Sequence, residues 1–289
     1  MIPFDLQSHS TVSDGELRPA DVVLAAAEAG VQLLALTDHD AVDGVDEALA
    51  AGAAHGVRIV PAVELSVRDH DGLRDLHLCG YLLDHHHPPL RQALHACRAD
   101  RAARADRMAD ALLSCGLQLD RAPMHVRAAS GNAVGRPHLA AAVFDHPANQ
   151  ARLRDEGLTD ATAVLVAYLI PGAPAFVPRP APTVADGIAL IHAAGGLAVW
   201  AHPFLEMTSD RDVCASIDRL GALSLDGVEA FYVTHTEAQT RLLVEHCARR
   251  GLLTTGSADF HGPGHGRNRF GAFQTYGLSP TLGPIAATP

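Results

Sequence analysis

The sequence predicts an α/β fold in which strand and helix units alternate around a parallel sheet. Short apolar runs alternate with helical patterns at close intervals near the N-terminus, and the same rhythm resumes after about residue 183. The 289-residue chain is 48% hydrophobic and 19% charged, so it can bury a sizeable core and is not composed like a disordered protein. A chain of this length accommodates about two domains or a single α/β barrel.

The first part of the sheet is expected within the first 87 residues. Pro19 begins an Ala-rich helix and Gly30 ends it, which matches the preference for proline at the first helical position and for glycine just after the last. Residues 69–72 predict the tip of a hairpin. The expected order is strand 2–6, helix 19–30, strand 33–37, helix 42–55, strands 57–60 and 62–67, and strand 76–82.

A mostly helical insert is expected at residues 88–180, because this segment lacks convincing strand patterns apart from short pieces. Arg101, Arg104 and Arg107 fall on one face of its first helix, which ends at Gly116. Such a face is usually solvated, and it is also able to attract an anionic substrate. The remaining order is helix 183–195 with Thr183 as its cap, strand 197–201, strand 228–233, helix 236–250 and strand 252–256. Residues 1–87 and 181–289 are therefore expected to form one domain around the insert.

The acidic composition argues against several classes of function. The 33 acidic residues outnumber the 22 basic ones and give a formal charge of -11, which disfavours binding to long nucleic acid. All the basic residues are Arg, so a P-loop lysine, a Schiff-base lysine and a lysine general base are excluded. Because the N-terminus lacks a signal-peptide pattern and no window is apolar enough to span a membrane, we expect a soluble, cytoplasmic protein.

Histidine is unusually frequent, whereas cysteine is not arranged as a ligand set. The chain has 18 His against 8 Phe, 4 Met, 4 Tyr and 1 Trp, an excess that favours a metal site. The 5 Cys are far apart and form no CxxC pair, so neither a disulfide framework nor a thiolate zinc site is indicated. A turn rich in exposed histidine accounts for His85, His86 and His87 without chemistry.

Potential metal ligands gather where the expected strands end. Residues two apart on a strand point to the same face, which directs Gln7 with His9, and Asp259 with His261, to one side. In a barrel the carboxyl ends of the strands converge on one mouth, so distant residues can share a site there. Imidazoles and carboxylates without thiolate suit Zn, Mn or Fe. The candidates are Asp5, Gln7, His9, Asp38, His39, Glu64, His77, His202, Asp259 and His261.

Several motifs in a fixed order give the chain a family resemblance. They are DLQSHSTVSDG, LTDHD, AVELS, HLCGY, GRPHL, AHP and SADFH. With them the chain resembles, over nearly its whole length, the polymerase and histidinol phosphatase (PHP) superfamily of metal-dependent phosphoesterases. The resemblance implies a distorted (β/α)7 barrel that holds two or three divalent metal ions (Mn, Zn or Fe), and a helical insert at 88–180 that covers the active site.

The resemblance also assigns ligands to each metal ion. It places one ion on His9, Glu64 and Asp259 together with position 7, a second on Glu64, His77 and His202, and a third on Asp14, His39 and His261. Of these residues, Asp14, His39, Glu64 and Asp259 are expected to take part in catalysis as well. Gln7 stands where the family usually has His, and an amide oxygen is a weaker ligand than imidazole for borderline transition metals. That position is therefore either looser, tuned to a harder ion such as Mn, or empty until substrate arrives.

The resemblance implies hydrolysis of a phosphate monoester of a small metabolite, most plausibly a nucleotide or nucleoside bisphosphate, by attack of metal-bound hydroxide. Arg136 and His138 of GRPHL are then expected to bind the phosphate, because a guanidinium fork matches phosphoryl oxygens. His235 is expected to contact the substrate or to protonate the leaving oxygen.

Three other activities remain open from the sequence. The same site suits a phosphodiesterase such as an exonuclease, although the net charge of -11 argues against long nucleic acid. Because of Gln7, the chain is also compatible with a weakened protein that binds a phosphorylated ligand without hydrolysing it. Hydrolysis of a C–N bond by the same metal cluster is the third alternative.

Overall fold

The computed structural model describes residues 3–69, 75–129, 134–178, 182–264, 266 and 268–287. The chain divides into two compact units. The barrel unit comprises residues 1–95 and 182–289, and the helical unit comprises residues 96–181. The division falls inside α3 (Pro88–Ser114), the helix that leaves the barrel unit.

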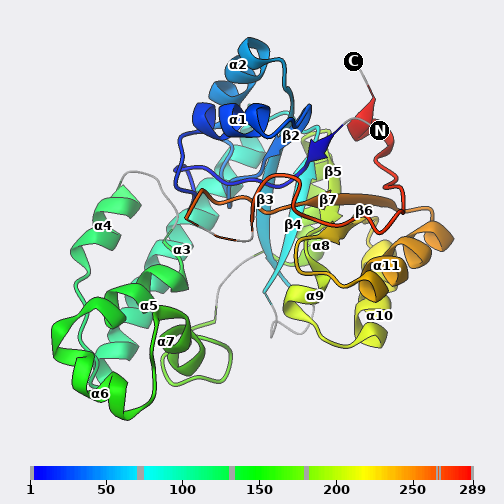
Figure 1. The fold of residues 1–289 in the computed structure, drawn as a ribbon. Helices are drawn as coiled ribbons and strands as arrows, with labels where there is room; N and C mark the ends of the chain where they lie inside the picture. Colours follow the sequence, from blue (N-terminus) through cyan, green and yellow to red (C-terminus); the bar gives the residue numbers. More distant parts are fainter. Residues whose placement is uncertain are drawn as a thin grey trace. The chain divides into compact units, whose positions relative to one another are not determined.

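The barrel unit is a sheet of seven strands in sequence order (Figure 1). Its strands are β1 (Phe4–Asp5), β2 (Leu33–Leu36), β3 (Arg58–Arg68), β4 (Asp75–Tyr81), β5 (Leu197–Trp200), β6 (Gly227–Tyr232) and β7 (Leu253–Ser257). Neighbours pair in parallel except β4, which is antiparallel to both β3 and β5. The two edges meet where the Leu6 amide donates to the Gly256 carbonyl over 3.1 Å and Ser8 bridges to Phe260. The predicted distorted (β/α)7 barrel is confirmed.

One strand prediction was wrong. Residues 57–60 and 62–67 were expected as two strands, but β3 runs through Pro61 without a break. Pro61 pairs with Leu36, the last residue of β2, so its missing amide hydrogen costs little in the ladder. The hairpin tip expected at 69–72 lies largely outside the described residues.

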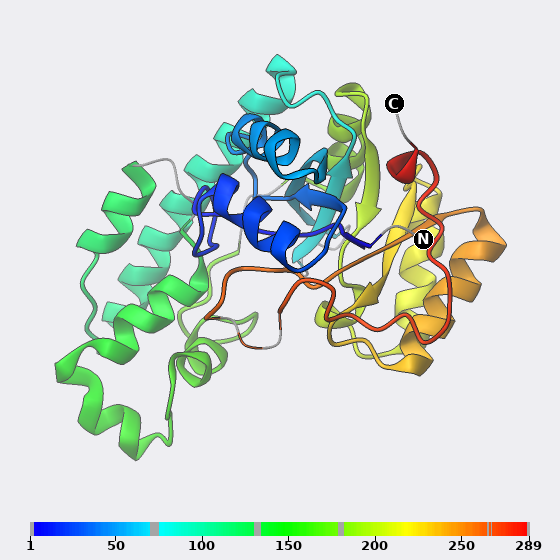
Figure 2. The ribbon, with the colours of Figure 1, turned by 45° about the horizontal axis from the view of Figure 1, so that its top comes forward.

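Helices cover the outside of the barrel, and their ends follow local sequence signals. They are α1 (Pro19–Glu28), α2 (Val45–His55), α8 (Val184–Ala193), α9 (Pro203–Glu206), α10 (Asp210–Gly221) and α11 (Glu237–Arg250). The predicted cap at Thr183 is confirmed, since its hydroxyl accepts a hydrogen bond from the Asp186 amide. Thr236 caps α11 in the same way. Figures 1 and 2 show α10 and α11 side by side, next to β6 and β7.

The core of the barrel unit is apolar and closely packed. Leu33, Leu34 and Leu36 of β2 are fully buried, and burying each leucine contributes about 1.5–3 kcal/mol relative to exposing it. The buried Tyr81 hydroxyl donates to the Leu6 carbonyl over 2.8 Å, so this large ring leaves no polar group unpaired. This packing makes a rigid frame for the loops at the strand ends.

The helical unit has a core of its own. Besides the later part of α3 it contains α4 (Ala122–Ala129), α5 (Arg136–Asp145), α6 (Gln150–Asp155) and α7 (Ala161–Tyr168). Leu112, Leu139 and Val143 are fully buried in its centre. The buried Asn149 side chain donates to the carbonyls of Gln118 and Val143 over 2.7 Å each, which ties the segment between α3 and α4 to α5.

The expected solvated arginine face is wrong for one of its members. Arg104 is buried, its Nε donates to the Val177 carbonyl over 2.6 Å, and its guanidinium lies over the Phe176 ring at 5.3 Å. An aromatic ring and a carbonyl together compensate the removal of a guanidinium from water. The side chain of Arg101 lies outside what the structure describes.

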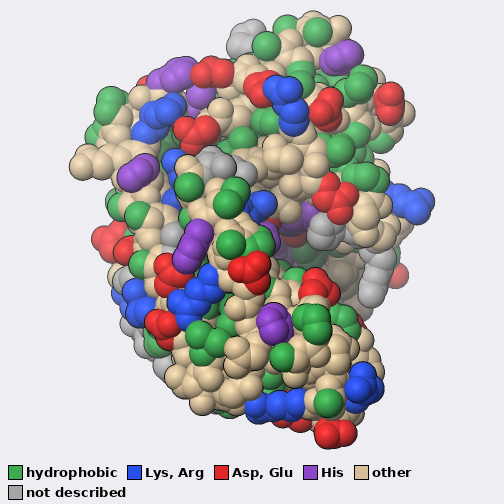
Figure 3. Space-filling model, turned by 90° about the vertical axis from the view of Figure 1, so that its left-hand side faces the viewer, with side chains coloured by type: hydrophobic (Ala, Val, Ile, Leu, Met, Phe, Trp, Pro, Cys, Tyr) green, Lys and Arg blue, Asp and Glu red, His purple; other side chains and the backbone are tan. Residues whose placement is uncertain are grey.

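One face of the molecule carries side chains of both charges. In Figure 3, arginine side chains and acidic side chains are interspersed over the face that is drawn. Such mixing differs from the continuous basic stripe that tracks a nucleic-acid backbone. None of the helices among the described residues is long and apolar enough to cross a membrane.

Candidate metal centre

The barrel gathers most of the expected ligands at one mouth, whereas Asp5 accepts hydrogen bonds from the amides of Ala258 and Gly271 and belongs to no ligand group among the described residues. His9, His39, His202, Asp259 and His261 follow the ends of strands that run in parallel. His77 lies early in β4, opposite Ser66 near the end of β3, so the antiparallel direction of this strand brings it to the same mouth. A parallel bridge between His39 and Glu64 joins the loop after β2 directly to β3.

Two of the candidates adopt a strained backbone. His202 and Asp259 have positive φ angles of 33° and 52°, in the left-handed region that residues with a Cβ rarely enter. Such conformations cost about 1–3 kcal/mol each and concentrate at functional sites. They aim these two side chains into the mouth.

Glu64 is the centre of the cluster. Its fully buried carboxylate lies among four imidazoles. Oε1 is 2.8 Å from His77 Nδ1 and 3.1 Å from His202 Nε2. Oε2 is 3.1 Å from His9 Nε2 and 3.2 Å from His39 Nδ1. A carboxylate with separate partners on each oxygen is suited to bridge two ions.

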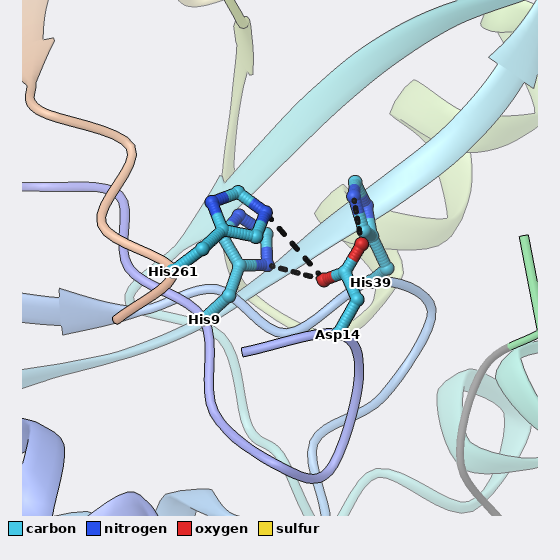
Figure 4. A group of neighbouring side chains, drawn as sticks. All are labelled: His9, Asp14, His39 and His261. Carbon is cyan, nitrogen blue, oxygen red and sulfur yellow. Dashed lines mark ion pairs between the residues drawn. The ribbon is translucent and has the colours of Figure 1, made fainter. Parts of the chain in front are cut away.

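Asp14 forms a second focus, shown in Figure 4. Its Oδ1 is 3.5 Å from His261 Nε2 and 3.7 Å from His9 Nδ1, and its Oδ2 is 3.7 Å from His39 Nε2. The rings of His9 and His261 stack with centroids 4.2 Å apart. The four side chains come from three different loops and surround a common point.

The buried donor atoms fit divalent metal ions. His9 Nε2 lies 3.0 Å from Asp259 Oδ1 and 3.1 Å from Glu64 Oε2, yet none of these atoms has a hydrogen-bond partner among the described residues. Around a tetrahedral ion with bonds of about 2.0–2.1 Å, ligand atoms lie about 3.3 Å apart. Leaving such polar atoms unpaired in a protein interior is costly unless a ligand satisfies them.

Three groups of side chains therefore have the spacing of metal ligands. They are His9, Asp14, His39 and His261; His39, Glu64 and His77; and His9, Glu64 and Asp259. The second group contains His39 where the resemblance implied His202, although His202 also contacts Glu64. The first adds His9 to the three residues implied for one ion. Shared ligands such as these are expected when neighbouring ions form a cluster.

Opposite charges outweigh burial at His9 and Glu64, whereas burial lowers the pKa of His39 to about 3. Burial lowers the pKa of an imidazole, but the carboxylates of Asp259 and Glu64 raise the pKa of His9 well above its usual value. Burial raises the pKa of a carboxylic acid, but the surrounding histidines hold the pKa of Glu64 well below its usual value. The site thus keeps its carboxylate ionised and attracts positive charge, which a divalent ion supplies in place of protons.

Buried polar groups behind the ligands hold them in place. The Tyr232 hydroxyl donates to Asp259 Oδ2 over 2.9 Å, and Glu229 Oε2 accepts from the His202 amide over 2.9 Å. Asp38 accepts hydrogen bonds from the hydroxyls of Ser10 and Ser13 over 2.7 and 2.6 Å. The roles of Tyr232 and Glu229 were missed from the sequence. The available signal was a carboxylate within the buried apolar run of β6.

Gln7 is fully buried beside Ser257. Its Oε1 is the acceptor of a long hydrogen bond of 3.5 Å from the Ser257 hydroxyl. Its Nε2 has no hydrogen-bond partner in the described part of the chain. The Gln7 amide therefore stands where the motif usually has an imidazole, and its nitrogen is left without a hydrogen-bond partner among the described residues.

The three expected substrate contacts lie in different places. His235 is buried in the barrel unit, with Nδ1 3.1 Å from the Ala230 carbonyl and Nε2 without a partner among the described residues. Burial lowers the pKa of His235 to about 4, so the ring is neutral at pH 7. Arg136 and His138 begin α5 in the helical unit, where His138 Nδ1 accepts from the Gly135 amide over 3.0 Å.

The chain matches a known family and curated relatives. Residues 5–132 match the model of the PHP domain. The chain is 32% identical to a 3',5'-nucleoside bisphosphate phosphatase of Chromobacterium violaceum, over 99% of this chain and 95% of that protein. It is also 32% identical to a 5'-3' exoribonuclease of Haemophilus influenzae, over 90% of each chain.

A solved structure has the same fold. It is described as an amidohydrolase from Chromobacterium violaceum with bound sulfate and no metal. It superposes with a TM-score of 0.79 at 29% identity, over 98% of this chain and 92% of that one. The similarity covers both the barrel and the helical segments of the sequence.

Proposed function

This chain belongs to the PHP family and is a metal-dependent phosphoesterase; from that premise we propose that it is a monoesterase acting on a small nucleotide, most plausibly a nucleoside 3',5'-bisphosphate. The metal chemistry rests on the buried, hydrogen-bond-free donor atoms of His9, Glu64 and Asp259. The curated relative of that name covers almost the whole length of this chain.

The proposed ligands are the imidazoles and carboxylates of the barrel mouth. They are His9, Asp14, His39, Glu64, His77, His202, Asp259 and His261, with Gln7 beside them. Two or three divalent ions held there would activate water as a nucleophile and stabilise the phosphoryl oxygens. Mn, Zn and Fe all suit this donor set. Of these residues, Asp14, His39, Glu64 and Asp259 would take part most directly in catalysis.

The protein's own groups orient this chemistry. Tyr232 fixes one oxygen of Asp259 and leaves the other toward His9. Glu229 fixes the backbone of His202. His235, neutral and with Nδ1 engaged by a carbonyl, presents a lone pair at Nε2 and so accepts a hydrogen bond from a substrate hydroxyl. This protonation state argues against the earlier alternative that His235 protonates the leaving oxygen.

We assign binding of the substrate phosphate to two residues of the helical unit. Arg136 would bind two phosphoryl oxygens through its guanidinium fork, and His138 would add a neighbouring contact. A net charge of -11 and the mixed charge seen in Figure 3 favour a small substrate over a long polyanion.

The test is phosphate release from a panel of substrates with Mn²⁺ added. The panel holds a nucleoside 3',5'-bisphosphate, the matching 5'-monophosphate and a short oligoribonucleotide. We expect the bisphosphate to give the highest kcat/KM and the Glu64→Gln variant to release none above background. Lack of phosphate release from every compound by the metal-loaded protein would refute the monoesterase.

A second candidate is a 5'-3' exoribonuclease, favoured by the relative of that name from Haemophilus influenzae. The same panel separates the two, because an exonuclease converts the oligoribonucleotide to mononucleotides without releasing inorganic phosphate. Mononucleotide release that exceeds phosphate release would favour this activity.

A further inference from the structure

A second group of metal-ligating side chains lies outside the barrel mouth and shares no residue with it. It consists of Asp46, His85 and His86, all in the barrel unit. Asp46 lies in the first turn of α2, and the two histidines lie in the turn between β4 and α3. From the sequence these histidines were explained as members of an exposed turn. This holds for His86 but is wrong for His85, which is buried, and it does not explain why both rings meet Asp46.

The three side chains have the spacing of a metal site. His85 Nε2 is 2.9 Å and His86 Nε2 is 3.3 Å from the same oxygen, Asp46 Oδ1. Neighbouring ligand atoms around a tetrahedral ion lie about 3.3 Å apart. The His86 distance matches this separation, and the His85 distance is slightly shorter. Two imidazoles and a carboxylate match the ligand types of zinc sites that keep a fourth position for water.

The backbone fixes the two histidines before any ion binds. The Asp84 carboxylate accepts from the His86 amide over 2.9 Å, and the Asp84 carbonyl accepts from the His87 amide over 3.0 Å. The Asp84 amide in turn donates to the Ala194 carbonyl over 2.8 Å, which anchors the turn to the loop after α8. A preorganised turn lowers the entropic cost of bringing ligands together.

Charge and ring packing also favour a cation. The hydrogen bond from His85 lowers the pKa of Asp46, so its carboxylate remains an anionic ligand. The two rings lie with centroids only 4.1 Å apart, so one divalent ion beside Asp46 can contact a nitrogen of each ring as well as the carboxylate.

We propose that Asp46, His85 and His86 form a separate binding site for one divalent transition-metal ion of the zinc type, which clips the start of α2 to the turn between β4 and α3. His85 is 9% exposed and provides the fixed ligand, whereas His86 lies at the surface and leaves the ion open to solvent. The clip joins residues 39 positions apart in the chain. Zinc that binds only the folded chain stabilises it by an amount that grows with the logarithm of its affinity.

Zinc binding to the chelator-stripped, full-length protein tests the site. Equilibrium dialysis is expected to give one equivalent fewer for His86→Ala and for Asp46→Asn than for the wild type. The matched control is His125→Ala, because His125 Nε2 makes a similar contact of 2.9 Å with the exposed Asp106 but belongs to no group of metal-ligating side chains among the described residues. It is expected to bind as many equivalents as the wild type. Equal binding by all four proteins overturns the proposal.

A second measurement follows the chemical accessibility of His86 itself, so ions bound at the barrel mouth do not contribute to it. Diethyl pyrocarbonate labels exposed imidazoles, and peptide mass spectrometry reports each one. Zinc is expected to reduce labelling of His86 at least tenfold and to leave His125 unchanged. The proposal is overturned if His86 is labelled equally with and without zinc, or if zinc protects His86 and His125 to the same extent. Phosphatase activity of His86→Ala at saturating Mn²⁺ is expected to equal that of the wild type, and a loss would contradict the separation of the two sites.

Discussion

The two oxygens of Asp259 face different partners: Oδ2 accepts the Tyr232 hydroxyl over 2.9 Å, and Oδ1 lies 3.0 Å from His9 Nε2. Burial and the neighbouring carboxylate raise the pKa of Tyr232, so its hydroxyl stays a donor at every pH of interest. One side of the carboxylate is thereby fixed and the other is left for a metal ion. Outer hydrogen bonds of this kind orient ligands and tune a metal site.

Tyr232→Phe is expected to weaken metal affinity or kcat/KM by about 10–100-fold while the fold is retained. Metal titration beside steady-state kinetics at saturating Mn²⁺ measures this. Recovery of kcat at high metal concentration would show that the hydroxyl acts through the ligand. The control is Tyr168→Phe in the helical unit. It loses the hydrogen bond from the Tyr168 hydroxyl to Glu156 and is expected to keep the metal affinity of the wild type. A Tyr232 variant with unchanged affinity and rate would contradict the positioning role.

Glu64→Gln removes the charge that four imidazoles share while keeping the shape of the side chain. The neutral amide of glutamine does not balance the charge of a divalent ion. Its oxygen can still act as a ligand, but its nitrogen cannot. We expect kcat/KM to fall on the order of a thousand-fold, equivalent to about 4 kcal/mol in the barrier. Metal content measured by elemental analysis is expected to fall with it. An active variant with full metal content would rule out Glu64 as the bridging ligand.

Gln7→His adds an imidazole at a buried position where the amide nitrogen has no partner in the described structure. If this position borders an ion, the new ring is expected to tighten Zn²⁺ binding about tenfold or more and to shift preference away from Mn²⁺. Competition titrations with both ions measure the change. Gln7→Ala is the control for loss of the amide. Identical affinities in wild type and Gln7→His would place position 7 outside the metal site.

His235 makes stability depend on pH in a known direction. Its pKa is lowered to about 4 by burial, against 6.5 for an ordinary histidine, so the unfolded chain binds a proton more readily. The folded state therefore loses stability as pH falls below about 6.5, and the loss levels off below about 4. Between pH 7 and 5 the wild type is expected to lose about 2 kcal/mol more than His235→Gln.

Urea unfolding of the metal-free proteins at the two pH values measures this difference. The chelator removes metal binding as a source of pH dependence. His125→Gln, at an exposed site, is expected to follow the wild type. Parallel pH profiles for wild type and His235→Gln would contradict a neutral, buried His235.

Arg136→Ala tests whether the helical unit binds the substrate phosphate. Loss of a charge-assisted hydrogen-bond pair is expected to raise KM and lower kcat/KM by about 10–100-fold. Arg136→Lys is expected to recover part of the loss, because lysine keeps the charge but not the fork. Arg154→Ala, an exposed arginine of the same unit, is the control. Unchanged kinetics in Arg136→Ala would remove this residue from the proposed site.

Local signals predicted much of the fold. Thr183 and Thr236 mark helix starts, and Gly30 and Gly195 follow helix ends in the left-handed conformation that glycine tolerates. These devices act through hydrogen bonds between near neighbours, so they can be read from a short stretch of sequence. The break expected at Pro61 does not occur, because the cost of a proline depends on the partner strand that it faces.

The candidate ligands were also accessible from the sequence, since metal-binding residue types stand out at the ends of apolar runs. The resemblance also grouped them, and His9, Glu64 and Asp259 do come together. That His39 also meets Glu64, and that Tyr232 reaches Asp259, depends on which strands become neighbours. The burial of Arg104 under Phe176 and the convergence of His85 and His86 on Asp46 have the same origin.

The sequence by itself determined the α/β class, the strand ends that carry ligands and the family to which the motifs belong. Only the tertiary structure decided which ligands share an ion-sized space and which buried groups hold them. The physical reason is that helix caps and alternating patterns are set by contacts between near neighbours. Coordination instead requires atoms far apart in the chain, such as those of His9, Glu64 and Asp259, to converge within about 3 Å of one another.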